Sequence, residues 1–177
     1  HYTVLKDKIP NQLSSGKKIL NFGAGHGGLS HLCWLDGLDV VNVEPSGMPQ
    51  FYETRWKSYT SIFDVPDCDF DLIYGSHSLE HVPDITTIQN EIKRILRPSG
   101  FLFWEVPNSA HPENGPKEGK VIIPHTYYFY TSFFDNWFDR VILNGGFDQC
   151  SRYGVIEMWQ NYSNEEGEVI RALGQIK

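Results

Sequence analysis

The sequence predicts an α/β fold with a doubly wound, mainly parallel seven-stranded sheet and an antiparallel hairpin near its C-terminal end. Two observations predict it. Short apolar runs alternate with segments of helical periodicity from Lys18 to Val106, and a glycine-rich turn follows the first of these runs. The chain has 177 residues, 40% of them hydrophobic, which suits a single domain with a sizeable core.

A βαβ unit is expected in the first part of the chain, after a short helix or coil. Residues 18–22 form an apolar run typical of a buried strand, and residues 39–43 form a second one. Between them, residues 28–38 have helical spacing, which predicts a helix whose inner side carries Leu29, Leu32, Cys33 and Leu35.

The turn between the first strand and helix has the composition of a ligand-binding loop. Gly23, Gly25 and Gly27 allow positive φ and close approach of a ligand, and the amides at the helix start favour a polar or anionic group. Gly23 and Gly25 also fit a dinucleotide-binding pattern with Gly28. Glu44 ends the second strand, where a carboxylate can accept hydrogen bonds from a ribose diol. Adenosyl cofactors and nicotinamide dinucleotides both carry that diol.

Further strands and a helix continue the alternation. Residues 59–63, 70–75 and 101–106 have the composition of strands, and residues 84–96 carry an apolar stripe that predicts a helix. Such alternation indicates parallel strands joined by right-handed crossovers.

The last third of the chain departs from this pattern. Residues 109–124 are rich in Pro, Gly, Lys and Glu and are expected to form a mobile insertion. We then expect a helix at 132–143, a hairpin at 147–162, and a terminal helix that starts at 163–166.

Composition narrows the class of partner and the location. A net charge of -7 and a pI near 5.4 disfavour nucleic acid and favour a small-molecule substrate. No run of about 18 apolar residues and no signal-peptide pattern occurs, so we expect no membrane span and a cytoplasmic protein. The sequence leaves open whether the chain forms a homo-oligomer. The three cysteines are widely spaced and are expected to be reduced thiols: Cys33, Cys68 and Cys150.

Five short motifs occur in a fixed order along the chain. They are ILNFGAGHG at 19–27, VEP at 43–45, FDLI at 70–73, SLEHVPD at 78–84 and ILRPSGF at 95–101. This order resembles the small-molecule group (methyltransferase-domain types 11 and 23) of the class I S-adenosylmethionine-dependent methyltransferases. The resemblance implies a Rossmann-like fold, S-adenosylmethionine as cofactor, and methyl transfer to a small acceptor. We expect an oxygen nucleophile of the sugar, phenol or carboxylate type.

The resemblance also implies which residues bind the cofactor. The glycine turn would pass under its methionine part, and Glu44 would bind the ribose hydroxyls. Ser76 and His77 would flank the sulfonium and the substrate pocket, and Asp64 is the candidate for the adenine segment, although it also suits a simple turn. Asn21 stands where the family usually has Asp or Glu. Its amide oxygen can accept a hydrogen bond but brings no charge.

Two histidines are candidate catalytic residues. His125 is the first, because imidazole can take a hydroxyl proton near neutral pH, and His81 is the second. Local packing is an equally good account of His125. Residues 77–81 also match the H-x-x-E-H pattern of zinc peptidases, which needs both histidines on one continuing helix. Pro83 would interrupt such a helix, so no metal is expected.

Two other classes of function stay open. A nicotinamide-dependent oxidoreductase shares the glycine turn, but the Tyr-x-x-x-Lys pair of its short-chain form occurs only at Tyr2 to Lys6, ahead of the turn. A noncatalytic binding or assembly module could retain the fold, which Asn21 makes conceivable. The residues before the first strand leave little material for the N-terminal lid of many relatives, so a truncated lid is expected.

Overall fold

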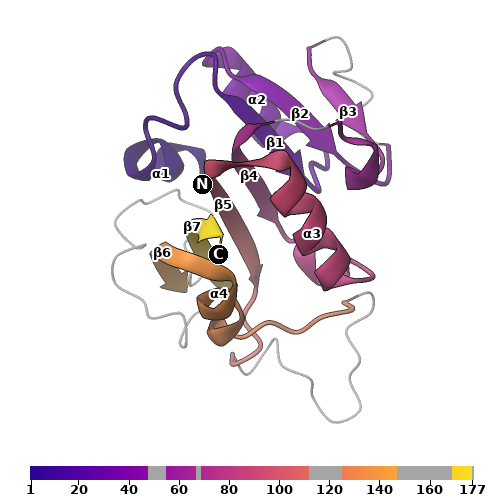
Figure 1. The fold of residues 1–177 in the computed structure, drawn as a ribbon, viewed down its shortest axis with the longest axis vertical. Helices are drawn as coiled ribbons and strands as arrows, with labels where there is room; N and C mark the ends of the chain where they lie inside the picture. Colours follow the sequence, from indigo (N-terminus) through magenta and orange to yellow (C-terminus); the bar gives the residue numbers. More distant parts are fainter. Residues whose placement is uncertain (48–54, 67–68, 112–124, 147–168, 177) are drawn as a thin grey trace. The chain divides into compact units, whose positions relative to one another are not determined.

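The computed structural model describes residues 1–47, 55–66, 69–111, 125–146 and 169–176 (Figure 1). Two compact units make up the chain. The first unit contains residues 1–75 and 84–101, and the second contains residues 76–83 and 102–177.

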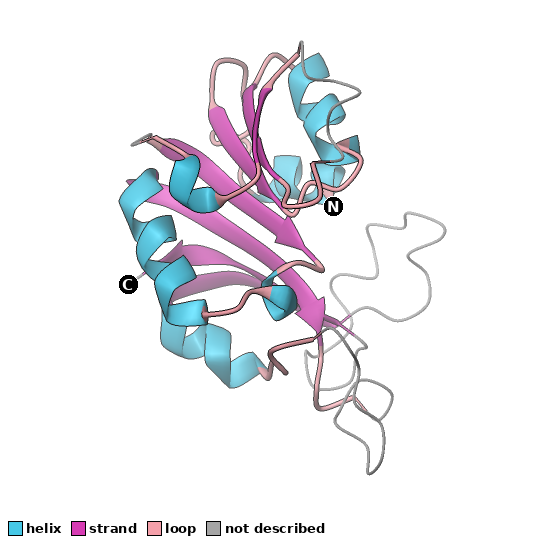
Figure 2. Ribbon diagram, turned by 90° about the vertical axis from the view of Figure 1, so that its right-hand side faces the viewer, coloured by secondary structure: helices cyan, strands magenta, loops and turns pink. Residues whose placement is uncertain are grey.

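Parallel strands form the centre of the first unit, in the order β3-β2-β1-β4. These strands are β1 (Lys18–Phe22), β2 (Asp39–Val43), β3 (Lys57–Tyr59) and β4 (Phe70–Ser76), whose last residue belongs to the second unit. The helices are α1 (Tyr2–Lys8), α2 (Gly28–Leu35) and α3 (Ile85–Ile95), with a 3₁₀ turn η2 (Ile62–Asp64). Figure 2 shows the strands between α2 on one side and α3 on the other, which is the doubly wound arrangement.

The sequence motif FDLI has a structural function in this unit. Asp71 is buried, accepts a hydrogen bond from the Lys18 amide (2.9 Å), and pairs with the Arg97 guanidinium. Its neighbours in β4, Leu72 and Ile73, are fully buried. The motif therefore anchors β4 in the core and ties it to the chain that follows α3.

Predictions for the first unit are mostly confirmed. Strands β1, β2 and β4 lie where the apolar runs are, and the Asp84 side chain caps α3 by accepting from the Thr86 amide (3.0 Å). The expected strand at 59–63 is wrong, because β3 ends at Tyr59 and a 3₁₀ turn follows.

The inner face of α2 was predicted correctly only in part. Cys33 is buried as predicted, but Leu32 and Leu35 are 46% and 60% exposed, and Ser30 is buried. The physical reason is that the Ser30 hydroxyl bonds to polar side chains of β1 and β2, which fixes that face of the short helix toward the strands. Burial of Cys33 raises the pKa of its thiol to about 12, so this cysteine is unreactive.

The second unit contains an antiparallel group of strands in the order β5-β7-β6. Its elements are β5 (Leu96–Pro107, from residue 102 onward), β6 (Phe138–Gly146), β7 (Val169–Ile176), α4 (Thr131–Trp137) and the 3₁₀ turn η3 (Leu79–His81). Strand β7 is antiparallel to both neighbours. Aromatic rings in stacked and tilted arrangements pack around α4, among them Trp104, Phe129, Phe134 and Trp137.

The expected C-terminal antiparallel pair is present, but different residues form it. The predicted helix at 132–143 stops at Trp137, and the chain continues as β6. Residues 169–176 form β7 where a terminal helix was expected. The predicted hairpin at 147–162 and most of the predicted insertion at 109–124 lie outside the described residues.

The described residues contain seven strands in all, and the predicted α/β class with parallel strands followed by an antiparallel pair is confirmed. None of the helices in these residues has the length and apolar content that a bilayer crossing needs.

Candidate functional site

The glycine turn of the first unit has the backbone that its sequence predicts. Gly23, Gly25 and Gly27 all have positive φ, at 70°, 51° and 77°. The Gly23 amide donates to the Val43 carbonyl at the end of β2 (2.8 Å), which fixes the turn beside that strand. A Cβ atom placed on Gly25 would meet no atom within 4 Å, whereas one on Gly27 would lie 3.3 Å from the Trp56 ring. The space at Gly25 is therefore open to a ligand.

Glu44 is joined directly to this turn. Its Oε2 accepts a hydrogen bond from the Gly25 amide (2.8 Å), and its Oε1 accepts from the Ser46 amide (3.0 Å) and the Ser46 hydroxyl (2.7 Å). Partial burial acts to raise the pKa of the carboxyl, but these hydrogen bonds outweigh it and hold the pKa of Glu44 below its ordinary value. Glu44 is thus an ionised carboxylate at the turn.

Asn21 belongs to a buried chain of polar side chains beneath the turn. Its amide nitrogen donates to the Ser30 hydroxyl (2.9 Å), which donates to the amide oxygen of Asn42 (2.6 Å). Asn21 is 3% exposed and lies opposite Asn42 in the register of β1 and β2. Because Ser30 takes the amide nitrogen, the amide oxygen of Asn21 stays available to a donor. The sequence analysis did not predict a function for Ser30, because it lies in α2, three residues after the glycine motif at 19–27 ends.

Asp64 has the surroundings of a turn residue. It is exposed at the end of η2, where its amide donates to the Ser61 carbonyl (3.2 Å).

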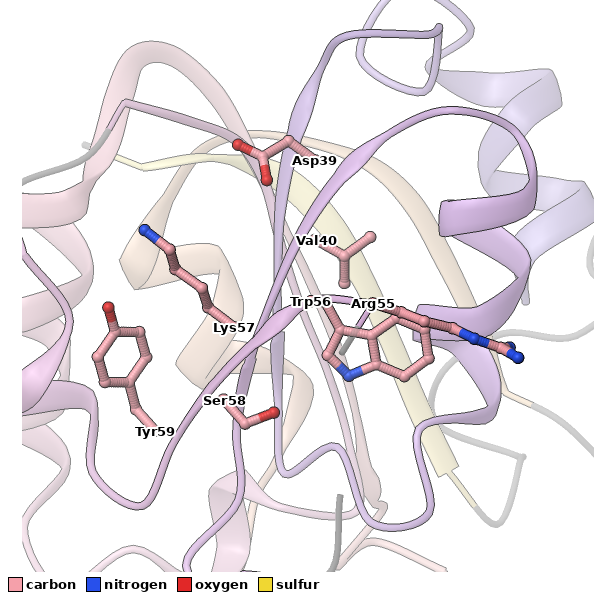
Figure 3. Close-up of a pocket in the computed structure, with 7 residues that line it drawn as sticks. All are labelled: Asp39, Val40, Arg55, Trp56, Lys57, Ser58 and Tyr59. Atoms are coloured by element: carbon pink, nitrogen blue, oxygen red, sulfur yellow. The ribbon is translucent and has the colours of Figure 1, made fainter. Parts of the chain in front are cut away.

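An open pocket of about 580 Å³ lies at the β2 and β3 side of this unit (Figure 3). Its described lining contains Asp39, Trp56 and Tyr59 but none of the predicted site residues.

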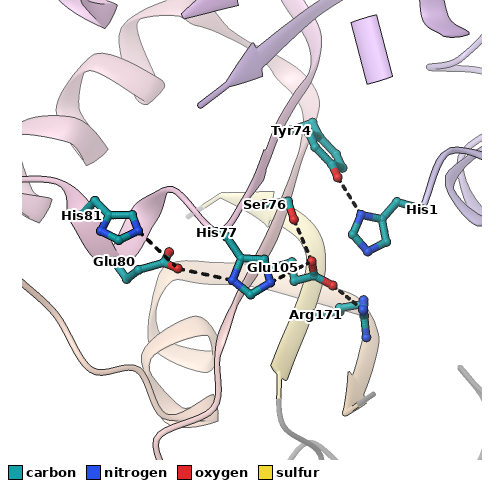
Figure 4. Close-up of polar contacts among 8 residues, drawn as sticks. All are labelled: His1, Tyr74, Ser76, His77, Glu80, His81, Glu105 and Arg171. Carbon is teal, nitrogen blue, oxygen red and sulfur yellow. Dashed lines mark hydrogen bonds and ion pairs between the residues drawn. The ribbon is translucent and has the colours of Figure 1, made fainter. Parts of the chain in front are cut away.

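Ser76 and His77 belong to a polar cluster in the second unit (Figure 4). The Ser76 hydroxyl donates to Glu105 Oε1 (2.7 Å), and the other oxygen of that buried carboxylate pairs with Arg171 of β7. His77 Nε2 lies 3.4 Å from Glu105 Oε1. Glu105 and Arg171 were not predicted as site residues, although a glutamate inside the apolar run of β5 was a usable signal.

His77 has an unusual backbone and a perturbed side chain. It is a non-glycine residue with φ of 49°, a conformation that costs energy and is concentrated at functional sites. Its Nδ1 lies 3.5 Å from Glu80 Oε1. Interaction with Glu80 raises the pKa of His77, burial acts in the opposite direction, and the charge of Glu105 adds to the increase.

His81 and His125 lie beside each other in the second unit, with ring centroids 4.9 Å apart in an edge-to-face arrangement. Two backbone hydrogen bonds hold them there, because the amides of Thr126 and Tyr127 both donate to the Glu80 carbonyl (2.8 and 3.1 Å). Residues 77–81 do not form a helix: β4 ends at Ser76, and η3 is a single 3₁₀ turn before Pro83. The zinc-peptidase helix is therefore absent from this segment, as expected.

A family model described as "Methyltransferase domain" matches residues 2–160 of this chain. The chain belongs to this methyltransferase family. Solved structures agree at the level of the fold. The SAM-dependent methyltransferase from Archaeoglobus fulgidus has a TM-score of 0.68 at 16% identity and covers 98% of this chain and 92% of its own. The possible histamine N-methyltransferase from Thermotoga maritima has a TM-score of 0.68 at 18% identity, covering 99% and 89%.

Curated relatives of this methyltransferase match about half of the chain. The ubiquinone biosynthesis O-methyltransferase of Pseudomonas putida (strain W619) is 29% identical over 107 residues, which cover 53% of this chain and 46% of that protein. The 2-methyl-6-phytyl-1,4-hydroquinone methyltransferase of Synechocystis sp. is 26% identical over 122 residues, which cover 54% and 38%. The chain thus spans about half the length, or less, of these relatives.

S-adenosylmethionine is the cofactor that this family and its solved neighbours imply. Three features of the first unit fit it. The open space at Gly25 leaves room for a ligand at the turn, the ionised Glu44 carboxylate can accept from a diol, and Asn21 has an available amide oxygen.

Proposed function

We propose that this methyltransferase transfers the methyl group of S-adenosylmethionine to an oxygen atom of a small-molecule acceptor. The observation that carries the proposal is the hydrogen bond from the Gly25 amide to Glu44 Oε2 (2.8 Å). It joins the glycine turn to the strand-end carboxylate, so one rigid element presents both groups that the cofactor's methionine and ribose parts require.

In this proposal the first unit provides the cofactor-binding residues. Glu44 accepts hydrogen bonds from the ribose hydroxyls, and Asn21 accepts one from the amino group through its amide oxygen. Asp64 is proposed for the adenine segment. Ser76 and His77, which the sequence suggested for the surroundings of the sulfonium, belong to the second unit. When bound, the cofactor supplies an electrophilic methyl group on a positively charged sulfur.

An oxygen acceptor must lose a proton during methyl transfer, and His125 is proposed to take it, with His81 as the second candidate. The carboxylate of Glu80 is buried, and its Oε1 lies 3.9 Å from His81 Nε2. The matching relatives named O-methyltransferases also support an oxygen acceptor.

Two measurements test the proposal. Calorimetry should detect binding of S-adenosylhomocysteine and none of NAD, which separates a methyltransferase from a nicotinamide-dependent enzyme. Methyl transfer from labelled S-adenosylmethionine should then be measured with phenols, hydroquinones, sugars and carboxylates, and with amines as controls. Binding of NAD alone, or of neither cofactor, would refute the proposed activity, and transfer to amines alone would refute the oxygen acceptor.

A further inference from the structure

The carboxylate of Glu80 is in an unusual electrostatic position. It is 1% exposed, and neither of its oxygens has a hydrogen-bond partner among the described residues. A buried carboxylate without hydrogen bonds costs several kcal/mol relative to water unless a cation compensates it. The ring nitrogens of His77 and His81 lie 3.5 and 3.9 Å from Oε1, which allows attraction between charges but not a good hydrogen bond.

A third imidazole completes this group from a distant part of the chain. One ligand atom each from Glu80, His81 and His125 can be chosen so that all three lie within 4.8 Å of one another. The backbone builds this arrangement, since the two amides after His125 donate to the carbonyl of Glu80 itself. The three side chains are therefore held together by these backbone hydrogen bonds and by the attraction between Glu80 and His81.

We propose that Glu80, His81 and His125 bind a divalent transition-metal ion of the zinc type. Two imidazole nitrogens and one carboxylate oxygen form a mixed donor set that suits zinc, cobalt or iron, whereas Mg²⁺ and Ca²⁺ prefer oxygen ligands alone. With metal–ligand bonds of about 2.0–2.2 Å, tetrahedral ligand atoms lie about 3.3–3.6 Å apart, so distances within the group must shorten by up to about 1.5 Å. His81 is 38% exposed, and such a side chain can rotate to close that gap.

The neighbouring His77 suits a supporting position in this site. Its Nδ1 faces Glu80 Oε1, and its Nε2 faces Glu105, so a ring N–H can hold the metal-binding carboxylate in place (Figure 4). Ligands in metal sites are commonly oriented by hydrogen bonds of this kind. Glu105 is itself fixed by Arg171 and Ser76, so the support continues into β5 and β7.

This site differs from the peptidase pattern that the sequence contains. In that pattern both histidines of H-x-x-E-H bind the metal from one helix, whereas here His125 replaces His77 as a ligand, and no helix is needed. The inference also goes beyond methyl transfer, because metal binding can be measured without cofactor or acceptor. A nitrogen that binds metal cannot accept a proton, so the proposed base function of His125 applies to metal-free protein.

The test uses the full chain after removal of metal with a chelator. Zn²⁺ or Co²⁺ is added, unbound metal is removed by gel filtration, and bound metal is measured by elemental analysis and calorimetry. We expect one ion per chain and binding of Zn²⁺ at least tenfold tighter than that of Mg²⁺. Glu80→Gln and His125→Ala should each weaken Zn²⁺ binding by about 100-fold or more. His31→Ala, which removes a histidine of the first unit, is the matched control and should leave binding unchanged.

Thermal unfolding distinguishes loss of the site from loss of the fold. Without metal, Glu80→Gln should unfold at the same temperature as the parent chain or higher, because it removes a buried charge whose oxygens have no hydrogen-bond partner among the described residues. Zn²⁺ should then raise the unfolding temperature of the parent chain but not of this variant. The proposal is wrong if the parent chain binds no Zn²⁺, or if Glu80→Gln and His125→Ala bind it as tightly as His31→Ala does.

Discussion

Replacement of Glu44 tests the proposed ribose site and the geometry of the glycine turn together. The carboxylate accepts one hydrogen bond from Gly25 and two from Ser46, and it would accept further bonds from the ribose. A hydrogen bond to a charged group contributes about 1.5–3 kcal/mol. Glu44→Ala should therefore weaken S-adenosylhomocysteine binding about tenfold to 100-fold. Glu44→Gln keeps one accepting oxygen and should lose less.

Calorimetry on folded variants is the assay, with Asp39→Ala as the control. Asp39 is an exposed carboxylate at the other end of β2, paired only loosely with Lys18 (3.7 Å), so its loss should leave cofactor affinity unchanged. If Glu44→Ala binds S-adenosylhomocysteine as tightly as Asp39→Ala does, the ribose site has been assigned to the wrong residue.

The pH dependence of stability provides an independent check on Glu44. Its pKa is lower in the folded chain than the ordinary value of 4.5. The stabilisation is therefore fully present above that value and is lost as the pH falls through the lower, folded pKa. The difference in stability between the parent chain and Glu44→Gln should shrink with acidification below about pH 4.5. A difference that stays constant to lower pH would contradict the assigned hydrogen bonds.

Four further results are expected. Gly27→Ala should destabilise the fold by about 1–2 kcal/mol in thermal unfolding because of its positive φ, whereas Gly28→Ala, at the start of α2, should be neutral. Equal effects would refute this reasoning. In chelator-treated protein, His125→Ala should lower turnover about 100-fold with cofactor affinity intact, and near-normal turnover would remove His125 as the base. Ser30→Ala should weaken cofactor binding because it frees the Asn21 amide to turn, and unchanged binding would show that Ser30 does not orient it. Cys33 should resist alkylation until the chain is unfolded, as peptide mass mapping can show.

The part of the fold that follows local pattern was predictable. Strands β1 and β2 are apolar runs beside a glycine turn, and α3 has an apolar stripe with an N-terminal aspartate cap. Strands β6 and β7 were not predictable in this way. A helix was expected because residues 163–166 are polar and suit a helix start, but residues 169–176 include the β-branched Val169, Ile170 and Ile176 and pair with β5 on one side and β6 on the other. Burial of Arg171 is possible only because Glu105 lies opposite in the register.

The candidate site residues also differ in how far the sequence could predict them. The glycine turn and Glu44 belong to short local motifs and were predicted from those motifs. The group of Glu80, His81 and His125 depends on two amide donors that reach the Glu80 carbonyl from 46 or 47 residues further along the chain. Residue spacing in the sequence does not indicate such a long-range hydrogen bond. The sequence therefore suggested His81 and His125 as separate candidates but did not predict that they lie side by side.

The uncharged chain of Asn21, Ser30 and Asn42 has a kinetic consequence for the proposed reaction. The amino group that Asn21 would bind is the same in S-adenosylmethionine and in the product S-adenosylhomocysteine, so an amide in place of a carboxylate weakens both by the same amount. Loss of such uniform binding raises KM without slowing the chemical step. Product release becomes faster as well, so this chain should be less inhibited by S-adenosylhomocysteine than its Asn21→Asp variant, and more dependent on the supply of the methyl donor.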